Sequence, residues 1–352
     1  MTSIADSGFW RGRRVLVTGH TGFKGTWLCA LLLRRGAAVA GIALPPDTEP
    51  ALWNLVPYAS EVESLTIDVR DRDAAAAAVA RLRPRTIFHL AAQPLVLRGY
   101  AEPVETYATN VMGTVHVLDA ARRCESTEQI VVVTSDKVYA DRPRAGGYAE
   151  DARLGGADPY AGSKAAAELV VETYRSAFFS HPGAAHVASA RAGNVIGGGD
   201  FAPNRLIPDA FRAVERGEPL VIRRPDAVRP WQHVLEPLDG YLALAEALAG
   251  GRARPDAYNF GPDAAERVDA VARRFLTRIG ANADALVVEP SAAHETALLA
   301  VDSARARAEL GWRPRWTTSE AVDATADWYR DHRAGEPAER LIARDAGAYF
   351  AR

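Results

Sequence analysis

Lysine is the residue that this sequence almost lacks. Only three of its 42 basic residues are lysines, Lys24, Lys137 and Lys164. Arginine serves wherever a generic surface cation is enough, but it cannot act as a compact point charge that releases its proton. The lysines stand in a glycine-rich run, after a short apolar run, and four residues after a tyrosine. This distribution indicates an enzyme.

Cysteine and long apolar runs are also scarce. The two cysteines, Cys29 and Cys124, lack CxxC or metal-ligand spacing, so we expect free thiols in a reducing compartment and no metal. The longest apolar run, residues 27–33, is too short to span a bilayer, and residues 1–14 contain no apolar signal core. These absences favour a cytoplasmic protein without a membrane segment.

Neither sign of charge dominates. The formal net charge is −2 at pH 7 and no basic stripe of helical period occurs, so a nucleic-acid partner is not expected. Apolar residues make up 48% and charged residues 24% of the chain, as is typical of a globular protein. The length of 352 residues allows one large or two modest domains.

Short β-branched runs alternate with amphipathic stretches from residue 14 to about 195. Strands are expected at residues 15–17, 39–42, 65–69, 86–90, 129–133 and 186–191. Helices are expected at residues 23–35, 72–82, 104–122, 160–178 and 235–248. This alternation predicts an α/β fold with a Rossmann-type, doubly wound parallel sheet and right-handed crossovers.

The pattern changes beyond residue 195, where proline, glycine and arginine become frequent. We therefore predict a Rossmann-type domain over residues 1–195, which the glycine motif described next assigns to NAD, and a smaller, mixed substrate domain over residues 196–352. Residues 232–262 are expected to return to the first domain. The smaller domain should cap the carboxyl edge of the sheet, where ligands of such folds bind.

Three glycines, Gly19, Gly22 and Gly25, follow the first expected strand and open the first expected helix. They permit a tight turn and close backbone approach, and the N–H groups of the helix N-terminus can bind a pyrophosphate. We therefore expect a dinucleotide site. The second strand ends without the acid that usually binds the adenosine ribose, and no arginine replaces it, so NADP is not favoured and NAD should bind loosely.

Asp68, at the end of the third expected strand, allows two interpretations. Its carboxylate could touch the adenine of the dinucleotide. It could equally cap the helix expected from residue 72, since aspartate is a favoured N-cap residue. The sequence leaves both interpretations open.

Tyr160 and Lys164 are four residues apart and fall on one face of an expected helix. A nearby cation favours the phenolate, so the pair could take the proton from a sugar hydroxyl while hydride leaves for a nicotinamide. Thr134 ends the preceding strand and would add a hydroxyl. The spacing alone is common by accident, but together with the glycine loop it resembles the extended short-chain dehydrogenase/reductase superfamily.

Asp136 and Lys137 follow Thr134 and narrow the reaction class. A simple alcohol dehydrogenase or 4-epimerase needs a hydroxyl donor and the tyrosine, and little else. An adjacent acid and potential base suggest a second proton transfer, as in elimination of water. The alternative is a capped turn with one exposed salt pair.

Several polar residues farther along are candidates for substrate contacts. Asn194 ends the sixth expected strand, where it could bind substrate hydroxyls or phosphate. Arg205 and Arg229 could bind a pyrophosphate bidentately, although a solvated surface role fits either one singly. His233, in a Trp-Gln-His run, could equally pack in the core.

Nine runs resemble the CDP-glucose 4,6-dehydratase family. They are VTGHTGFKGTWL (17–28), LAAQPLV (90–96), TNVMGTVHVLDAAR (109–122), VTSDKVY (133–139), DPYAGSKAAAELV (158–170), RAGNVIGGGD (191–200), RLIPD (205–209), RPWQHVLEPLDGYL (229–242) and YNFGP (258–262). The Asp-Lys pair is the most discriminating feature, since dehydratases acting on dTDP-glucose carry Asp-Glu there.

This resemblance implies a reaction scheme. Tyr160, helped by Lys164 and Thr134, removes the proton from the hydroxyl on carbon 4 as hydride passes to NAD. Lys137 removes the proton on carbon 5 while Asp136 protonates the departing hydroxyl on carbon 6. The hydride then returns to carbon 6, so CDP-glucose becomes CDP-4-keto-6-deoxyglucose.

The resemblance also implies binding residues. Expected contacts to NAD come from Gly19, His20, Gly22, Phe23, Lys24, Gly25, Asp68, Val69, Leu90, Ala91, Ala92, Gln93, Thr109, Tyr160 and Lys164. Expected contacts to the nucleotide sugar come from Gln93, Asn194, Arg205, Arg229 and His233. The chain departs from the family pattern at Leu97, Gly99, Phe201 and Pro203, near the expected sugar and nucleotide pocket.

Two other functions compete with this interpretation. A 4-epimerase, or a 4,6-dehydratase for another nucleotide sugar, would use the same fold. A catalytically silent NAD-binding regulatory protein is the alternative from another class, but it predicts erosion of Tyr160, Lys164 or Asp136, and all three are present. We also expect a homodimer through a four-helix bundle, because the stretches 104–122 and 160–178 carry apolar residues on more than one face.

Overall fold

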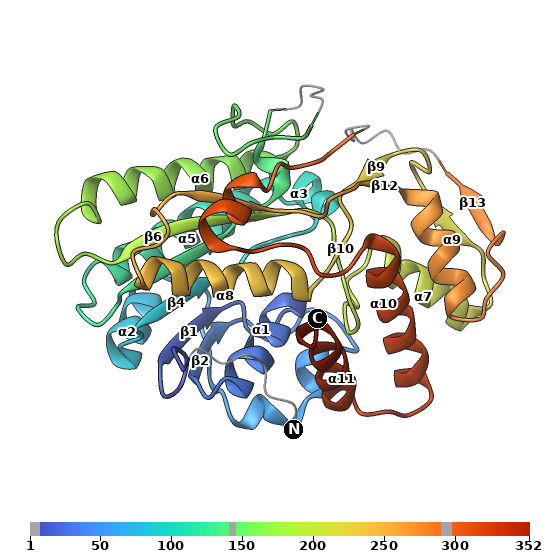
Figure 1. Cartoon of the computed structure of the whole chain (residues 1–352), viewed down its shortest axis with the longest axis horizontal. Coiled ribbons are helices and arrows are strands. Elements are labelled where there is room, and N and C mark those ends of the chain that lie inside the picture. Colours follow the sequence, from blue (N-terminus) through green and yellow to red (C-terminus); the bar gives the residue numbers. More distant parts are fainter. Residues whose placement is uncertain (1–7, 141–145, 290–297) are drawn as a thin grey trace.

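The computed structural model describes residues 8–140, 146–289 and 298–352. Its centre is a parallel sheet whose seven strands follow the order β3-β2-β1-β4-β5-β6-β11 (Figure 1). They are β1 (Arg14–Thr18), β2 (Ala38–Ala43), β3 (Glu63–Thr66), β4 (Thr86–His89), β5 (Gln129–Val133), β6 (His186–Ala192) and β11 (Ala257–Phe260). The predicted Rossmann-type, doubly wound α/β fold is confirmed.

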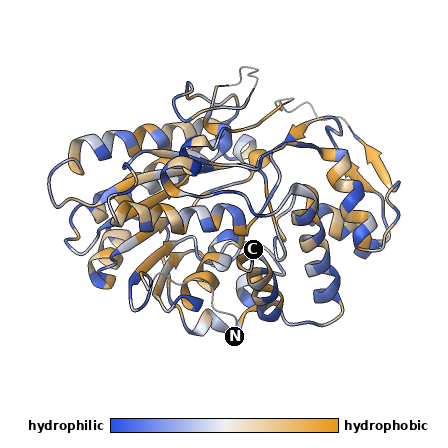
Figure 2. Cartoon of the chain, in the orientation of Figure 1, coloured by the Kyte–Doolittle hydropathy of each residue, from blue (hydrophilic) through white to orange (hydrophobic). Residues whose placement is uncertain are grey.

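Helices cover both faces of this sheet. One face carries α1 (Phe23–Arg34) and α8 (Leu235–Ala249), and the other carries α2 (Arg72–Leu82), α5 (Gly113–Ala121) and α6 (Pro159–Phe178). Strand β1 contributes Val15 and Val17 to the first core and Leu16 to the second, because successive side chains of a strand point to opposite faces. Figure 2 shows the strands of the sheet in the hydrophobic colour.

The expected helix over residues 104–122 is interrupted. The chain forms α3 (Val96–Ala101), α4 (Pro103–Tyr107), a π-helical turn (Ala108–Met112) and then α5. Asn110 lies in the π-helical turn, where its amide donates to the carbonyl of Gln93 at 3.1 Å and to Ser163 Oγ at 2.8 Å. Such turns frequently occur at functional sites. Here the turn joins the segment after β4 to the start of α6.

The rest of the chain forms the smaller part of the molecule. It contains α7 (Leu206–Arg216), α9 (Val268–Arg278), α10 (Thr318–Arg333) and α11 (Ala338–Phe350). Its two-stranded sheets pair β7 (Val195–Ile196) with β10 (Gln232–His233), β9 (Val228–Arg229) with β12 (Glu266–Arg267), and β8 (Leu220–Ile222) with β13 (Leu286–Val288). Between these elements the chain returns to the main sheet, where α8 packs on β5 and β11 pairs with β6.

The short helical turns are Leu52–Leu55, Pro57–Ser60, Asp136–Val138 and Ala306–Leu310. The strand expected at residues 65–69 lies earlier in the chain, since β3 runs over Glu63–Thr66 and leaves Asp68 in the following loop. Within the described parts of the chain, no helix has the length and apolar character needed to cross a membrane.

Candidate active site

The start of helix α6 positions the tyrosine and the lysine. The Asp158 side chain accepts from the Ala161 N–H at 2.9 Å, and Pro159 occupies the first helical position, where its missing N–H costs nothing. Tyr160 therefore lies in the first turn, with Lys164 one turn later. The Lys164 ammonium is buried and donates to the Val133 carbonyl at the end of β5 at 3.1 Å.

The electrostatics of Tyr160 differ from the expectation. Burial raises the pKa of the phenol to about 12, and the main opposing influences are a hydrogen bond with Ser135 and the charge of Arg205. Burial also lowers the pKa of Lys164 to about 8, and the charge of Glu168 opposes that shift. In the structure, then, desolvation outweighs the expected lowering of the phenol's pKa by a nearby cation.

Thr134 and Ser135 point their hydroxyls to different partners. Thr134 donates to a carboxylate oxygen of Glu168, behind the strand end. Ser135 is the hydroxyl that interacts with the Tyr160 phenol, and it also donates to Asp136 Oδ1 at 3.0 Å. The hydroxyl expected beside Tyr160 is therefore supplied by Ser135, which the sequence analysis did not single out.

Asp136 and Lys137 begin a short helical turn, capped by the Ser135 side chain, which accepts from the Lys137 N–H at 3.1 Å. Asp136 is 3% exposed, so the pair is not an exposed salt pair. Its Oδ2 atom is buried and has no hydrogen-bond partner. Burial raises the pKa of this carboxyl against the opposing charge of Lys137, which favours a protonated acid that can donate.

The glycine loop has the geometry of a dinucleotide cradle. Gly19 has φ +74°, and a Cβ there would lie 2.8 Å from Ala91 Cα. A Cβ on Gly25 would lie 2.2 Å from the Gly19 carbonyl oxygen. Gly22 is exposed at the N-cap of α1, which has no side-chain cap. The loop therefore leaves the helix N-terminus open for a phosphate, so its residues fit NAD.

His20 is a buried residue of the glycine loop whose ring lies against strand β2. It has no exposed surface, and its Nε2 pairs with Ser64 Oγ at 2.7 Å. Its ring fills the space beside Gly41, where a Cβ would lie 2.2 Å from the ring, and it packs edge-on against Trp53. Gly41 and Trp53 therefore enclose the ring, and a direct contact between His20 and the cofactor stays a prediction.

Lys24 lies in the first turn of α1 and couples to the catalytic groups. Burial lowers its pKa to about 7, the charges of Arg205 and Lys164 lower it further, and those of Asp136 and Asp200 oppose them. Lys24 is thus electrostatically coupled to Lys164 and Asp136, two of the candidate catalytic residues. Its partly exposed neighbour Phe23 packs on the segment at residue 197.

Asp68 does not cap helix α2. The N-cap is Asp71, whose carboxylate accepts from the Ala74 N–H at 3.0 Å. Asp68 instead accepts from the Arg70 N–H and Nε, both at 2.8 Å, and this pairing holds its pKa below the usual value. The N-cap interpretation is wrong, because Asp71 is the residue directly before α2 and caps it. The adjacent Val69 is buried beneath Gly113.

The segment after β4 lies at the carboxyl edge of the sheet. Leu90, Ala91 and Ala92 are partly exposed, and Thr109 is partly exposed on the π-helical turn. Gln93 is buried, and its amide donates to Thr106 Oγ1 at 2.9 Å and accepts from the Leu95 N–H at 2.7 Å. These hydrogen bonds show that the Gln93 side chain stabilises the segment that follows β4.

The smaller part of the molecule brings two arginines to the catalytic groups. Arg205 donates to Asp200 at 2.8 Å, and its charge reaches the Tyr160 phenol. Arg229 acts on the carboxyl of Asp136. Asn194 is partly exposed at the start of the β7 segment. Arg229 is buried and Arg205 is partly exposed, and the contact of either one with a pyrophosphate stays a prediction.

His233 is a core residue. It has no exposed surface, and its ring packs between Trp27 and Trp316, with centroids 5.8 and 4.9 Å away. Burial lowers its pKa to about 3, so the ring is neutral. These aromatic neighbours enclose the side chain, and its expected contact with substrate stays a prediction.

Two of the departures from the family pattern have a packing reason. A Cβ on Gly99 would lie 3.3 Å from the Tyr160 backbone nitrogen, so a larger residue there would press on the catalytic helix. Phe201 packs edge-on against Tyr329, with centroids 6.0 Å apart, on the side of α10. Neither residue needs a substrate contact to explain it.

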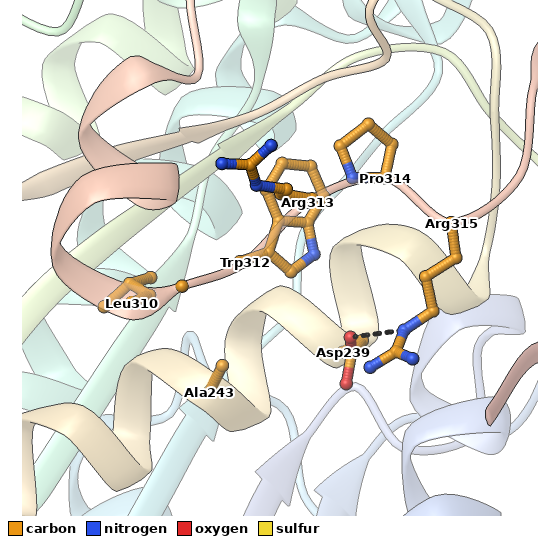
Figure 3. A pocket seen from close by; sticks show the side chains of 8 residues that line it. Asp239, Ala243, Leu310, Trp312, Arg313, Pro314 and Arg315 are labelled. Atoms are coloured by element: carbon orange, nitrogen blue, oxygen red, sulfur yellow. Dashed lines mark ion pairs between the residues drawn. The ribbon is translucent and has the colours of Figure 1, made fainter. Parts of the chain in front are cut away.

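A separate cavity of about 380 Å³ lies between α8 and the segment before α10 (Figure 3). It is lined by Asp239, Ala243, Leu310, Gly311, Trp312, Arg313, Pro314 and Arg315. Arg315 pairs with Asp239 across it at 3.5 Å. None of the candidate catalytic residues lines this cavity. Among the described residues, no cluster of His, Cys, Asp or Glu could hold a metal ion.

Comparison of the chain with known proteins identifies its family. Residues 16–325 match the family model of GDP-mannose 4,6 dehydratase. The chain belongs to this family. The CDP-glucose 4,6-dehydratase of Salmonella typhimurium is 43% identical over 340 residues, which cover 95% of each chain. The dTDP-glucose 4,6-dehydratase of Streptomyces antibioticus is 31% identical over 336 residues, 91% of this chain and 93% of the relative.

Solved structures of similar proteins share the fold. The dTDP-glucose 4,6-dehydratase DesIV of Streptomyces venezuelae, solved with NAD bound, has a TM-score of 0.78 and 26% identity and covers 93% of this chain and 99% of its own. A UDP-glucose 4-epimerase of Thermotoga maritima has a TM-score of 0.80 at 20% identity, covering 90% of this chain and 99% of its own. The family resemblance seen in the sequence is confirmed.

Proposed function

We propose that this protein is an NAD-dependent 4,6-dehydratase that converts CDP-glucose to CDP-4-keto-6-deoxyglucose. One observation carries the proposal. Asp136 is a buried carboxyl with a raised pKa and an oxygen without a partner, and it stands between Ser135 and Lys137. A second acid–base pair beside Tyr160 is needed to eliminate water, whereas oxidation of an alcohol alone does not need it. The similarity to the Salmonella enzyme supports the nucleotide sugar.

The cofactor would be held by the glycine loop and by α6. Residues 19–25 place the open N-terminus of α1 toward a pyrophosphate, and Tyr160 and Lys164 lie at the carboxyl edge of the same sheet. NAD, when bound, supplies a hydride acceptor and later returns the hydride. The NAD-bound relatives support this cofactor.

In the first step, Tyr160 takes the proton from the hydroxyl on carbon 4 as hydride leaves that carbon. Its phenol has a raised pKa, so the phenolate depends on the positive charges around it. Ser135 orients the phenol, and the Arg205 guanidinium stabilises its ionised form. We assign to Ser135 the hydroxyl role that the resemblance gives to Thr134.

In the second step, the new ketone acidifies the hydrogen on carbon 5. Lys137 removes that proton while Asp136 protonates the hydroxyl that leaves carbon 6. Hydride then adds to carbon 6, and Lys137 returns its proton to carbon 5. Arg205 and Arg229 provide positive charge near Tyr160 and Asp136, which suits the diphosphate of the nucleotide.

The decisive experiment incubates the protein and NAD with CDP-, dTDP-, UDP- and GDP-glucose and follows product mass. Loss of one water from the CDP sugar alone is the expected result. Loss from another sugar nucleotide would retain the mechanism and overturn the specificity. An unchanged mass with an epimerised product, detected by NMR, would instead establish the 4-epimerase alternative.

The protein is proposed to act as a homodimer through a four-helix bundle. Helices α4 and α6 pack side by side with the π-helical turn. Large apolar side chains on them remain exposed, with Val104 82%, Leu169 55% and Met112 46% exposed. A second copy would cover this surface by the same helices, since a two-fold interface uses the same patch twice.

The cytoplasm is the proposed compartment of the reaction. Cys29 and Cys124 are free thiols, with Cys29 fully buried in the core. Thiols of this kind are typical of a reducing compartment. Secretion of the protein with its activity intact would overturn this assignment.

A further inference from the structure

Glu168 is a buried carboxylate on the catalytic face of α6. It follows Tyr160 and Lys164 at intervals of four residues, so the three side chains form one row along the helix. Glu168 is 4% exposed. One carboxylate oxygen accepts from Thr134, and the other accepts from Ser189 Oγ and Arg191 Nη2, both at 2.7 Å. Helix α6, the end of β5 and strand β6 thus meet at one anion.

We propose that Glu168 is a positioning residue that keeps Lys164 a cation during the reaction and fixes the strand end that carries Thr134. This inference rests on the proposed function for its catalytic consequence. It does not depend on that function for the charge of Lys164. Glu168 would touch neither substrate nor cofactor, because its oxygens are directed to buried protein groups.

The charges around Lys164 support this role. Lys24 from α1 and His89 from β4 are the other titratable groups that couple to Lys164, and neither is an anion that would stabilise it. Burial lowers the pKa of His89 to about 3, so that ring is neutral. Glu168 is the carboxylate that opposes the desolvation of Lys164.

Glu168 itself is kept ionised. Burial would raise the pKa of its carboxyl, but the Arg191 guanidinium and the Thr134 and Ser189 hydroxyls outweigh burial and lower it. Charge-assisted hydrogen bonds of this kind are about twice as strong as neutral ones. Glu168 is therefore an ionised carboxylate that pairs with Arg191 and follows Lys164 by one helical turn.

Arg191 connects this anion to the far edge of the sheet. It also donates to Tyr139 Oη at 2.8 Å and to the Glu150 carbonyl at 2.9 Å. The Tyr139 hydroxyl donates in turn to Asn259 Oδ1, on strand β11, at 2.6 Å. A continuous polar chain thus fixes Glu168, so the position of its charge is set by the folded structure rather than by a mobile side chain.

The direct test measures the titration of Lys164. The chain has three lysines, so protein labelled with ¹⁵N-lysine gives a small set of side-chain signals that single substitutions can assign. In E168Q, the Lys164 pKa should fall by about one unit or more, because burial is no longer opposed by an anion. E172Q changes an exposed glutamate one turn farther along α6 and should leave the Lys164 pKa unchanged.

The pH dependence of turnover gives a second readout. If Lys164 acts as a cation, kcat/KM for CDP-glucose falls as pH rises through its pKa, and this basic limb should move to lower pH in E168Q by the same shift. A purely structural role would lower kcat/KM equally at every pH. Should E168Q not fold, E168D keeps the charge, so its Lys164 pKa should stay within about half a unit of wild type while kcat falls.

An unchanged Lys164 pKa in E168Q would overturn the proposal, and so would a large fall in E168D. The NMR titration needs no substrate. Its outcome is therefore independent of the proposed function, and failure of the wild-type protein to dehydrate CDP-glucose would leave the electrostatic inference intact.

Discussion

At the scale of single residues, the reaction depends on which side chains remain without a partner in the folded protein. Most buried polar atoms form hydrogen bonds, so an orphaned carboxyl oxygen needs a physical explanation. Asp136 Oδ2 is such an atom, and Gly193 leaves room beside it, since a Cβ there would lie 3.2 Å from this oxygen. The leaving hydroxyl on carbon 6 is the partner that the proposed reaction brings to it.

Lys137→Ala should separate oxidation from elimination. Without the base for the carbon 5 proton, the variant should still reduce bound NAD when CDP-glucose is added, but water loss should slow by about 10²- to 10⁴-fold. Absorbance of the reduced cofactor and product mass measure the two steps separately. Full dehydratase activity in the variant would remove Lys137 from the scheme.

Substitutions of the neighbouring residues Ser135 and Thr134 should have different effects, the first on kcat and the second on stability. Ser135→Ala removes the group that contacts both Tyr160 and Asp136, so kcat should fall by about 10²-fold or more, and Ser135→Thr should retain most of it. Thr134→Val removes the bond to Glu168 and should mainly lower thermal stability, by about 1–3 kcal/mol. A larger kcat loss in Thr134→Val than in Ser135→Ala would reverse the assignment.

At the scale of elements, the strand ends and helix starts place the chemistry. β1 ends before the glycine loop, β5 ends before Ser135, and α6 begins at the cap formed by Asp158. The π-helical turn between α4 and α5 inserts Asn110 between two of these segments. Local capping and parallel pairing together bring the carboxyl ends of the strands to one edge.

Gly25→Ala tests the glycine loop. Its Cβ would lie 2.2 Å from the Gly19 carbonyl, so the backbone must shift, and NAD binding should weaken by about tenfold or more. Gly347→Ala is the matched control, because that helical glycine on α11 has no atom within 4 Å of an added Cβ. Calorimetric titration with NAD measures both variants. Equal NAD affinity in Gly25→Ala and wild type would contradict the cradle.

At the level of the whole molecule, the proposed site draws on both parts of the chain. Tyr160, Lys164 and Asp136 come from the main sheet and its helices, whereas Arg205 and Arg229 come from the smaller part. Segments α8 and β11 return to the sheet and connect the two parts. The exposed apolar side chains on α4 and α6, among them Val104 and Leu169, form the proposed dimer surface.

Leu169→Asp should dissociate the dimer without unfolding the protein. The side chain is 55% exposed, so the new charge costs little in the monomer and much in a buried apolar interface. Val170 is unsuitable for this test, because it packs against the second core. Val288→Asp, on strand β13 and 51% exposed, is the control. Light scattering should give half the mass for Leu169→Asp alone, and an unchanged mass would reject this interface.

The elements that depend on local periodicity and backbone requirements can be predicted from the sequence. The helix over residues 72–82 and the strand over residues 129–133 have the predicted bounds, since their patterns and caps are local. The glycine loop was also predictable, because Gly19 and Gly25 occupy positions where a Cβ would meet backbone atoms. The family could be recognised from runs along the whole chain.

The orientation and hydrogen-bond partners of the site's side chains, in contrast, depend on the tertiary fold. Thr134 and Ser135 are neighbours at a strand end, and no local pattern tells which hydroxyl turns to Glu168 and which to Tyr160. His20 and His233 looked suited to ligands, but packing encloses both. Burial and partners come from segments distant in the sequence, and it is these long-range contacts that set the direction, charge and accessibility of each group.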